Sequence, residues 1–326
     1  MNLLVIGGTR FIGRAVVARL CADGHLITVM HRGSCAAQLP PGARELGGDR
    51  DRSEDVARAL AVSAAEVVID MVLYSAEQAT QLRAAALGRT RRLVVASSLD
   101  VYRAYERVAG DATGLPDPVP LDEQAPLRET AFPRRKLALG PSDWRYDYDK
   151  LQVERILGRE PRLPATVLRL PYVYGPGDYR HRTWPHLSRM DRGLPLVLSP
   201  LEAAWRASRA YVENVAEIFA LCVAREVAAG RTYNVADEPT LCEREWIAAI
   251  GRAAGWSGEL ELAAEPPAGA PPGAGRRGHF AQHLELDARR VRAELDYRQP
   301  VALAQALEQT IRWQRAHPPE GAEPRD

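Results

Sequence analysis

The sequence of 326 residues has few cysteines, no excess of charge of either sign and no long apolar run. Cys21, Cys35, Cys222 and Cys242 lack the spacing of a metal or redox site, and the first residues form an apolar strand pattern rather than a charged leader. Both features predict a cytoplasmic protein. The 43 basic and 42 acidic residues are interspersed, so charge indicates neither a polyphosphate nor a membrane partner. No apolar stretch approaches the ~20 residues of a membrane span.

Metal binding and nucleic-acid binding also lack support in the sequence. His181 and His186 do not have the spacing of metal ligands, so we expect no metal site. We find no basic patch with interleaved aromatic residues, and we therefore expect no nucleic-acid partner. The 46% apolar content is enough for a substantial core, which indicates one large domain or two interlocked ones.

A glycine-rich turn follows the first expected strand, which covers residues 3–6. Gly7 and Gly8 would let the backbone approach a pyrophosphate, and Gly13 would let the following helix pack close to the strand. Strand, glycine turn and helix in this order predict a dinucleotide site, and a tight turn without a ligand is the alternative. The other expected cofactor contacts in this turn are Thr9, Arg10, Phe11 and Ile12, with Arg10 at the usual middle glycine.

Short apolar strands alternate with amphipathic helices up to about residue 165. The strands are expected at 3–6, 26–30, 67–72, 93–98 and 165–169, and helices at 212–225, 243–254 and 301–315. This alternation predicts an α/β fold with a doubly wound parallel sheet. We expect a dinucleotide-binding Rossmann domain over residues 1–168, with returning segments near 205–237. A smaller mixed α/β substrate-binding domain would cover 169–326.

Two segments rich in proline and glycine interrupt this pattern. Residues 110–141 should form a long irregular excursion, and excursions of this size are usually functional or mobile. Residues 265–275 should form either a flap near the substrate pocket or a plain surface loop. The last ten residues should be disordered.

The adenosine end of the expected cofactor site departs from the usual pattern. The second strand ends in His31 and Arg32, where many NAD sites carry an acid that binds the ribose. Arg10 and Arg32 are candidates to bind a 2′-phosphate, or Arg32 stacks on the adenine. Asp49 and Arg50 follow the third strand as further cofactor candidates, and Asp49 alone is equally explained as an acidic turn residue.

Tyr146 and Lys150 stand four residues apart at the head of an apolar-periodic stretch. This spacing places a phenol and an ammonium on one helical face, where the cation favours the phenolate of a general base. A solvated helix face is the alternative. Tyr148 is the rival base, but it would lie on the opposite side of the helix from Lys150.

Six motifs occur in the order found in extended short-chain dehydrogenases/reductases, and the chain resembles their NAD-dependent epimerase/dehydratase branch. The motifs are residues 7–13, 95–102, Tyr146 with Lys150, 168–178, 209–212 and 233–235. The resemblance covers residue 3 to at least residue 237. Arginine at the middle glycine position is similar to atypical members of the superfamily.

The resemblance implies roles for residues at the carboxyl edge of the sheet. Ser98 would bond the oxygen being oxidised while Tyr146 removes its proton, and Lys150 would bond the nicotinamide ribose. A hydroxyl that caps its own strand end is the alternative for Ser98. Tyr172 would contact the cofactor. The expected substrate contacts are Ser98, Leu99, Tyr174, Arg182 and Arg209, the last on the phosphates of a nucleotide sugar or in a surface salt bridge.

Asp100 lies at the position that separates reaction types in this family. Dehydratases carry a glutamate there that handles the proton beside the transient ketone, whereas 4-epimerases carry small neutral residues. Asp100 is one methylene shorter than glutamate, so it either removes this proton or merely bonds substrate. An acidic loop residue without a chemical part is the further alternative.

The resemblance therefore implies an enzyme that oxidises a hydroxyl transiently, with NAD as cofactor and NADP as the alternative. We favour dehydration slightly over epimerisation, on a nucleotide sugar or a nucleoside. Other readings are a net reductase that consumes NADPH and an RNA-binding relative. Epimerase-like relatives often pair through two helices, so we also expect a homodimer in which residues 75–87 and 146–157 supply the contact.

Overall fold

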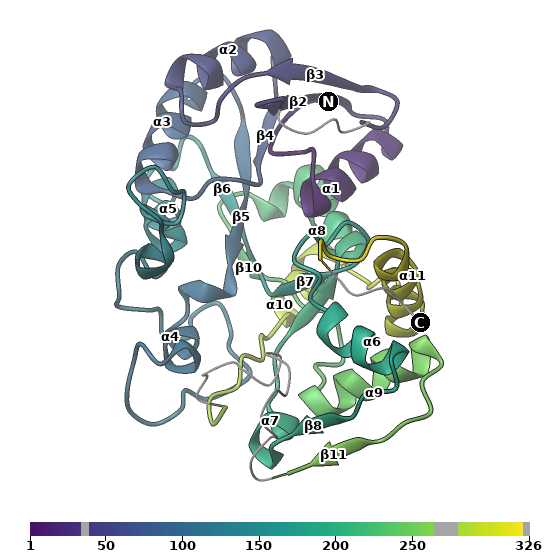
Figure 1. Ribbon diagram of the computed structural model, residues 1–326. Helices are drawn as coiled ribbons and strands as arrows, with labels where there is room; N and C mark the ends of the chain where they lie inside the picture. The colour runs from purple at the N-terminus through teal and green to yellow at the C-terminus, as the bar shows by residue number, and fades with distance from the viewer. Residues whose placement is uncertain (34–38, 264–279, 322–326) are drawn as a thin grey trace.

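The computed structural model describes residues 1–33, 39–263 and 280–321. Its centre is a seven-stranded sheet in the order β10-β6-β5-β4-β1-β2-β3, in which every neighbouring pair is parallel (Figure 1). The strands are β1 (Asn2–Ile6), β2 (Leu26–His31), β3 (Ala43–Gly47), β4 (Val67–Asp70), β5 (Arg92–Ser98), β6 (Ala165–Leu170) and β10 (Thr232–Asn234). The predicted doubly wound α/β fold is confirmed.

Helices cover both faces of this sheet (Figure 1). On one face, α1 (Phe11–Ala22) packs against α8 (Val212–Ala224). On the other face, α2 (Ser53–Ser63), α3 (Ala76–Ala86) and α5 (Lys150–Leu157) lie in succession. The inner strands β4 and β6 are buried at every position because both of their faces meet helices, whereas β3 at the edge is largely exposed.

A smaller α/β region follows β6 and carries two short parallel sheets. One pairs β7 (Tyr172–Tyr174) with β9 (Arg209–Tyr211), and the other pairs β8 (Leu196–Leu198) with β11 (Leu260–Leu262). Its helices are α6 (Trp184–Asp191), α7 (Pro200–Ala204), α9 (Glu243–Ala254), α10 (Arg289–Leu295) and α11 (Leu303–Ala316). Strand β10 returns from this part of the chain to the main sheet beside β6.

Of the two segments rich in proline and glycine, the structure describes the first and not the second. After β5, the chain forms the short 3-10 helix η1 (Leu99–Val101) and α4 (Arg103–Ala109). The excursion over 110–141 then contains one short 3-10 turn, η2 (Arg135–Leu137), so its predicted irregularity is confirmed. The segment 265–275 and residues 322–326 lie outside the described residues.

Within the described ranges, no helix combines the length and apolar character needed to cross a membrane.

The turn between β1 and α1 depends on close packing at two glycines. Gly7 has φ +84°, and a Cβ there would lie 2.7 Å from Val72. A Cβ on Gly13 would lie 2.2 Å from the backbone oxygen of Gly7, and no side-chain rotation relieves such a contact. Helix α1 therefore approaches β1 this closely because position 13 is glycine.

Gly13→Ala should lower the free energy of unfolding by about 1–3 kcal/mol, because the new methyl group collides with main chain rather than with a flexible side chain. Gly47→Ala is a matched control, since a Cβ at Gly47 meets no described atom within 4 Å. Urea unfolding followed by circular dichroism measures both variants. Equal unfolding free energies for the two variants would contradict the close packing at Gly13.

Candidate active site

The N-terminus of α1 lies at the glycine turn without a side-chain cap. Arg10 is the N-cap residue, its side chain accepts no first-turn amide, and the first turn has no acidic residue. Thr9 and Ile12 are half-buried beside it, and the buried Phe11 packs edge-on against Tyr179 at 6.5 Å. The first amides of α1 are thus open to an anion at the positive end of the helix. These residues fit the pyrophosphate of a dinucleotide.

The candidate residues for the adenosine end fall into two groups. Arg10 and Arg32 are exposed. Asp49 Oδ1 accepts the amide of Asp51 at 3.0 Å, which is the turn contact that the sequence left as an alternative. Arg50 was expected to contact the cofactor, but its guanidinium is buried in an ion pair with Asp70 at 3.0 Å.

The prediction that Tyr146 and Lys150 share a helical face is wrong. Helix α5 begins at Lys150, with Asp149 as its N-cap, and Tyr146 precedes it. The Asp149 carboxylate accepts the amide of Gln152 at 3.1 Å, which fixes the first turn of the helix after Tyr146. The Tyr146 ring instead packs 4.5 Å from the guanidinium of Arg135.

Tyr148, the rival tyrosine, lies with Ser98, Asp100 and Lys150 at the carboxyl end of β5. Its hydroxyl donates to Asp100 Oδ2 at 2.8 Å and is also hydrogen-bonded to Ser98. Ser98 Oγ accepts the amide of Asp100 at 3.2 Å, so local capping is present as well. Lys150 Nζ donates to the backbone oxygen of Ala96 at 2.6 Å. A phenol therefore meets a carboxylate and a hydroxyl, which together can move a proton at a substrate hydroxyl.

The electrostatics of this cluster keep the phenol neutral. Burial, and then the charge of Asp100, raises the pKa of Tyr148 well above its usual value. Burial also lowers the pKa of Lys150 to about 8, against the opposing charges of Asp70 and Asp100. The sequence predicted a phenolate at Tyr146 beside Lys150, whereas the tyrosine in this cluster is Tyr148 and its phenol is neutral at rest.

Arg134 joins the cluster from the irregular excursion, and the sequence analysis missed it. Its Nη2 donates to Asp100 Oδ2 at 2.7 Å, and its guanidinium lies 4.5 Å from the centre of the Tyr148 ring. Burial opposes the charge of Arg134, but Tyr148 and Asp100 raise the pKa of its guanidinium. No spacing in the sequence points to this residue, because its segment has no regular structure.

The excursion is anchored next to Arg134 by a second buried carboxylate. Asp149 forms a fully buried ion pair with Arg128 and accepts the amide of Phe132 at 3.2 Å. The same residue donates its own amide to the backbone oxygen of Tyr74 at 2.8 Å. Asp149 therefore holds the excursion, the segment after β4 and the start of α5 in one place.

Aromatic rings cover the cluster. The ring of Tyr74 lies 5.0 Å from that of Trp144 and 5.8 Å from that of Tyr148. Lys150 Nζ lies 4.9 Å from the centre of the Tyr74 ring. Burial raises the pKa of Tyr74 to about 12, with a further contribution from Tyr179. These rings shield Tyr148 and Lys150 from water.

Most of the predicted substrate contacts line a cavity of about 200 Å³ in the smaller α/β region. Its walls combine cationic and aromatic side chains, which suit the phosphates and the base of a nucleotide. Leu99 is different, because it is only 3% exposed and packs in the core. Tyr172, expected at the cofactor, lines this cavity instead. The residues used below are Tyr172, Tyr174, Arg182, His186, Arg209, Glu243 and Trp246.

Arg209 already has partners in this cavity. It forms an ion pair with Glu243, which lies 3.5 Å from His186, and its guanidinium lies 4.5 Å from the ring centre of Trp246. The salt bridge that the sequence left as an alternative is therefore present. A phosphate that binds Arg209 must compete with Glu243.

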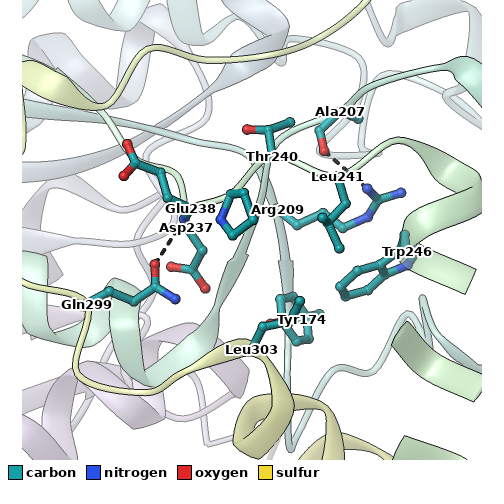
Figure 2. A pocket seen from close by; sticks show the side chains of 11 residues that line it. Tyr174, Ala207, Arg209, Asp237, Glu238, Thr240, Leu241, Trp246, Gln299 and Leu303 are labelled. Carbon is teal, nitrogen blue, oxygen red and sulfur yellow. Dashed lines mark hydrogen bonds between the residues drawn. The ribbon is translucent and has the colours of Figure 1, made fainter. Parts of the chain in front are cut away.

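Tyr174, Arg209 and Trp246 also line a smaller cavity that contains Asp237 (Figure 2). Figure 2 shows Asp237 on the side of this cavity opposite Trp246. The Asp237 carboxylate accepts the amide of Tyr211 at 2.8 Å and Asn214 Nδ2 at 2.9 Å. Burial nevertheless raises the pKa of Asp237 to about 6.

Across the part of the chain that the structure describes, no three His, Cys, Asp or Glu side chains are arranged to hold a metal ion.

A family model described as NAD dependent epimerase/dehydratase family matches residues 3–236. Among curated proteins, the chain is 24% identical over 251 residues to the chloroplast stem-loop binding protein of 41 kDa b of Arabidopsis thaliana. The match covers 73% of this chain, which spans 59% of the length of that relative.

Solved structures share the fold over almost the whole chain. The UDP-glucose 4-epimerase of Thermotoga maritima with UDP-glucose has a TM-score of 0.70 at 18% identity, over 97% of this chain and 99% of that one. The UDP-glucose 4-epimerase of Thermus thermophilus with NAD gives 0.68 at 23%, over 97% and 100%. The dTDP-glucose 4,6-dehydratase of Streptomyces venezuelae with NAD gives 0.69 at 21%, over 97% and 98%. At these identities the likeness concerns the fold.

Asp237→Asn should stabilise the protein at pH 8 by up to about 3 kcal/mol, because it removes a buried charge and keeps an acceptor for Tyr211 and Asn214. The raised pKa means that protonated Asp237 stabilises the fold fully below its ordinary value of 3.8, and that this stabilisation is lost as pH rises through about 6. The gain should thus be about 1 kcal/mol smaller at pH 5. Urea unfolding at both pH values measures it, with Glu261→Gln on the surface as the control. A gain independent of pH would contradict the shifted pKa.

Proposed function

Because the chain belongs to the NAD-dependent epimerase/dehydratase family, we propose that it modifies a nucleotide sugar by transient oxidation of one hydroxyl group. Bound NAD would supply the reversible hydride acceptor for this chemistry. The uncapped N-terminus of α1 supports a site for the pyrophosphate, formed by Gly7, Gly8 and Gly13 with the amides of residues 9–12. Substrate and cofactor would then meet at the carboxyl end of β5.

The observation that carries this proposal is the contact between Tyr148 and Asp100 beside Ser98. We assign to Tyr148 the part that was expected of Tyr146, which is to take the proton of the substrate hydroxyl. Ser98 would hydrogen-bond the same substrate oxygen. Lys150 holds the last residues of β5 through the carbonyl of Ala96 and so positions Ser98.

Epimerisation fits this site better than the elimination favoured on sequence. An elimination that uses Asp100 needs its carboxylate to face a substrate carbon. Asp100 is 1% exposed, and its Oδ2 is bonded by both Tyr148 and Arg134. Transient oxidation followed by return of the hydride to the other face requires no further acid or base from Asp100 at carbon.

We propose NAD rather than NADP, because a cycle that begins by oxidising substrate needs the more oxidised of the two dinucleotide pools. Arg10 and Arg32 are exposed, and they would become the 2′-phosphate ligands of NADP if the protein were a net reductase.

A nucleotide sugar is the proposed substrate because the cavity of about 200 Å³ combines Arg182 and Arg209 with aromatic walls. Arg209 would bind a phosphate after exchanging Glu243 for it. A nucleoside is the alternative, since it would leave the pair of Arg209 and Glu243 intact.

Tyr148→Phe should lower turnover about 100-fold or more, because a phenyl ring fills the site but cannot take a proton. Tyr146→Phe is the matched control and should stay close to the parent rate, since its ring packs on Arg135 outside the cluster. The assay supplies NAD with UDP-glucose or dTDP-glucose and follows products by chromatography and mass spectrometry. Unchanged mass with inverted configuration supports epimerisation, whereas loss of water supports elimination. A large loss in Tyr146→Phe alone would return the role to Tyr146.

Binding of an RNA stem-loop is a second candidate, supported by the likeness to the chloroplast stem-loop binding protein. Many arginines of this chain pair with acids, as Arg182 does with Asp178 and Arg209 with Glu243, which leaves less free positive charge for a phosphate backbone.

We therefore expect RNA binding no tighter than about micromolar in 150 mM salt, a typical non-specific range. Filter binding of a labelled RNA stem-loop against a single strand of equal length measures it. Nanomolar, stem-loop-selective binding in a protein that turns over neither sugar nucleotide would favour the RNA candidate.

A further inference from the structure

The carboxylate of Asp100 is buried but only half satisfied. One oxygen, Oδ2, accepts from Tyr148 at 2.8 Å and from Arg134 at 2.7 Å. The other, Oδ1, is buried without a hydrogen-bond partner among the described residues. A carboxylate that serves only as a structural ion pair is expected to satisfy both oxygens, so the ion pair with Arg134 does not use the full bonding capacity of Asp100.

The geometry of the three side chains is imposed by separate elements. Asp100 lies in η1 directly after β5, Tyr148 precedes α5, and Arg134 comes from the excursion. The buried pair of Asp149 and Arg128 joins the last two elements. The position of Arg134 relative to Asp100 is therefore set by the anchored main chain of the excursion rather than by a freely rotating surface side chain.

Tyr148 needs a proton acceptor if it is to act on a substrate hydroxyl. Its phenol is neutral in the free protein, because burial and the charge of Asp100 disfavour the phenolate. Lys150 does not remedy this, since its ammonium is itself buried and bonded to the carbonyl of Ala96. Among the residues described, Asp100 is the one negatively charged acceptor that is hydrogen-bonded to the phenol of Tyr148.

We propose that Asp100 is the proton acceptor behind Tyr148, and that Arg134 is a positioning residue that holds the carboxylate for this purpose. The inference rests on the proposed function. When the substrate hydroxyl is oxidised, its O–H bond breaks and its proton passes to the Tyr148 oxygen. The original phenolic O–H bond breaks at the same time, and that proton passes to Asp100 Oδ2. Bound NAD would supply the acceptor for the hydride of the same carbon, and both protons would move back when that hydride returns.

This relay gives the carboxylate of Asp100 a function at the position where the family resemblance implies small neutral residues in 4-epimerases. The relay keeps the phenol of Tyr148 neutral before and after the step, so no phenolate has to persist in the poorly hydrated space beside the rings of Tyr74 and Trp144. Arg134 lies over the Tyr148 ring and against Asp100, so its charge stabilises negative charge on either oxygen during the transfer.

Among the described residues, few titratable groups surround the pair of Asp100 and Tyr148, so a titration of Tyr148 can be interpreted. They are Arg134 from the excursion, Lys150 from α5, Tyr74 from the segment after β4, and Tyr105 of α4 beside Arg134, and Asp70 of β4 acts in turn on Lys150 and Tyr74. Changing Asp100 or Arg134 one at a time therefore separates their charges.

The first experiment measures the ionisation of Tyr148 without substrate. The full chain is labelled with a fluorinated tyrosine whose phenol ionises nearer neutrality, and Tyr148→Phe identifies its ¹⁹F resonance among the 11 tyrosines. In Asp100→Asn, Tyr148 should ionise about one pH unit lower or more, and in Arg134→Gln about one unit higher or more. Arg135→Gln is the matched control and should move neither. Ionisation of Tyr148 at the parent pH in both variants would overturn the proposal.

The second experiment measures rate with NAD and the sugar nucleotide that the parent turns over. Asp100→Asn should lower kcat about 100-fold or more, because an amide cannot take the phenolic proton. Arg134→Gln should lower kcat with little change in KM, while Arg134→Lys restores kcat in part. Near-parent kcat in Asp100→Asn, with Tyr148→Phe inactive, would overturn the relay and leave the proposed function intact. Near-parent kcat in Tyr148→Phe would instead contradict the proposed role of Tyr148.

Discussion

One buried carboxylate, Asp149, determines the arrangement of the candidate active site. It caps α5, pairs with Arg128 out of contact with water, and ties the excursion and the segment after β4 to the helix start. A buried charge of this kind persists only when several partners compensate its loss of hydration. The carboxylate is bonded by the excursion and by α5, and the amide of Asp149 is bonded to Tyr74, so the relative positions of these three segments are fixed together. Our proposal of Tyr148 rather than Tyr146 as the base rests on where this cap starts the helix.

The need to compensate buried charges also applies to the ionised side chains that lie beneath the aromatic rings. Asp100, Arg134 and Lys150 lie within one poorly hydrated region, and each has a hydrogen-bonding partner. In such surroundings, hydrogen bonds to charged groups are stronger than in water and isolated charges are costly. A ligand that enters this region would meet groups already oriented by their neighbours, so little reorganisation is needed at the moment of reaction.

The sheet and the main helices could be predicted from the sequence, because apolar periodicity and glycine turns are local patterns. The expected helix over 243–254 coincides with α9, and the expected strand 93–98 differs from β5 by one residue. Ser98 and Lys150, which the ordered motifs singled out, both lie at the carboxyl end of β5. The start of α5 at Lys150 could also have been predicted, because Asp149, followed three residues later by Gln152, is itself a helix-start pattern. Arg134 could not be predicted, because a long-range ion pair rather than a local pattern sets the path of its segment.

The composition gives the excursion a practical property. The chain has two lysines, Lys136 and Lys150, in 326 residues. Lys150 is buried under Tyr74, whereas Lys136 is exposed and lies two residues beyond Arg134. An amine-reactive dye would therefore attach to one accessible side chain besides the N-terminal amine. Its fluorescence would report how the segment that carries Arg134 responds to each added ligand, without an engineered cysteine.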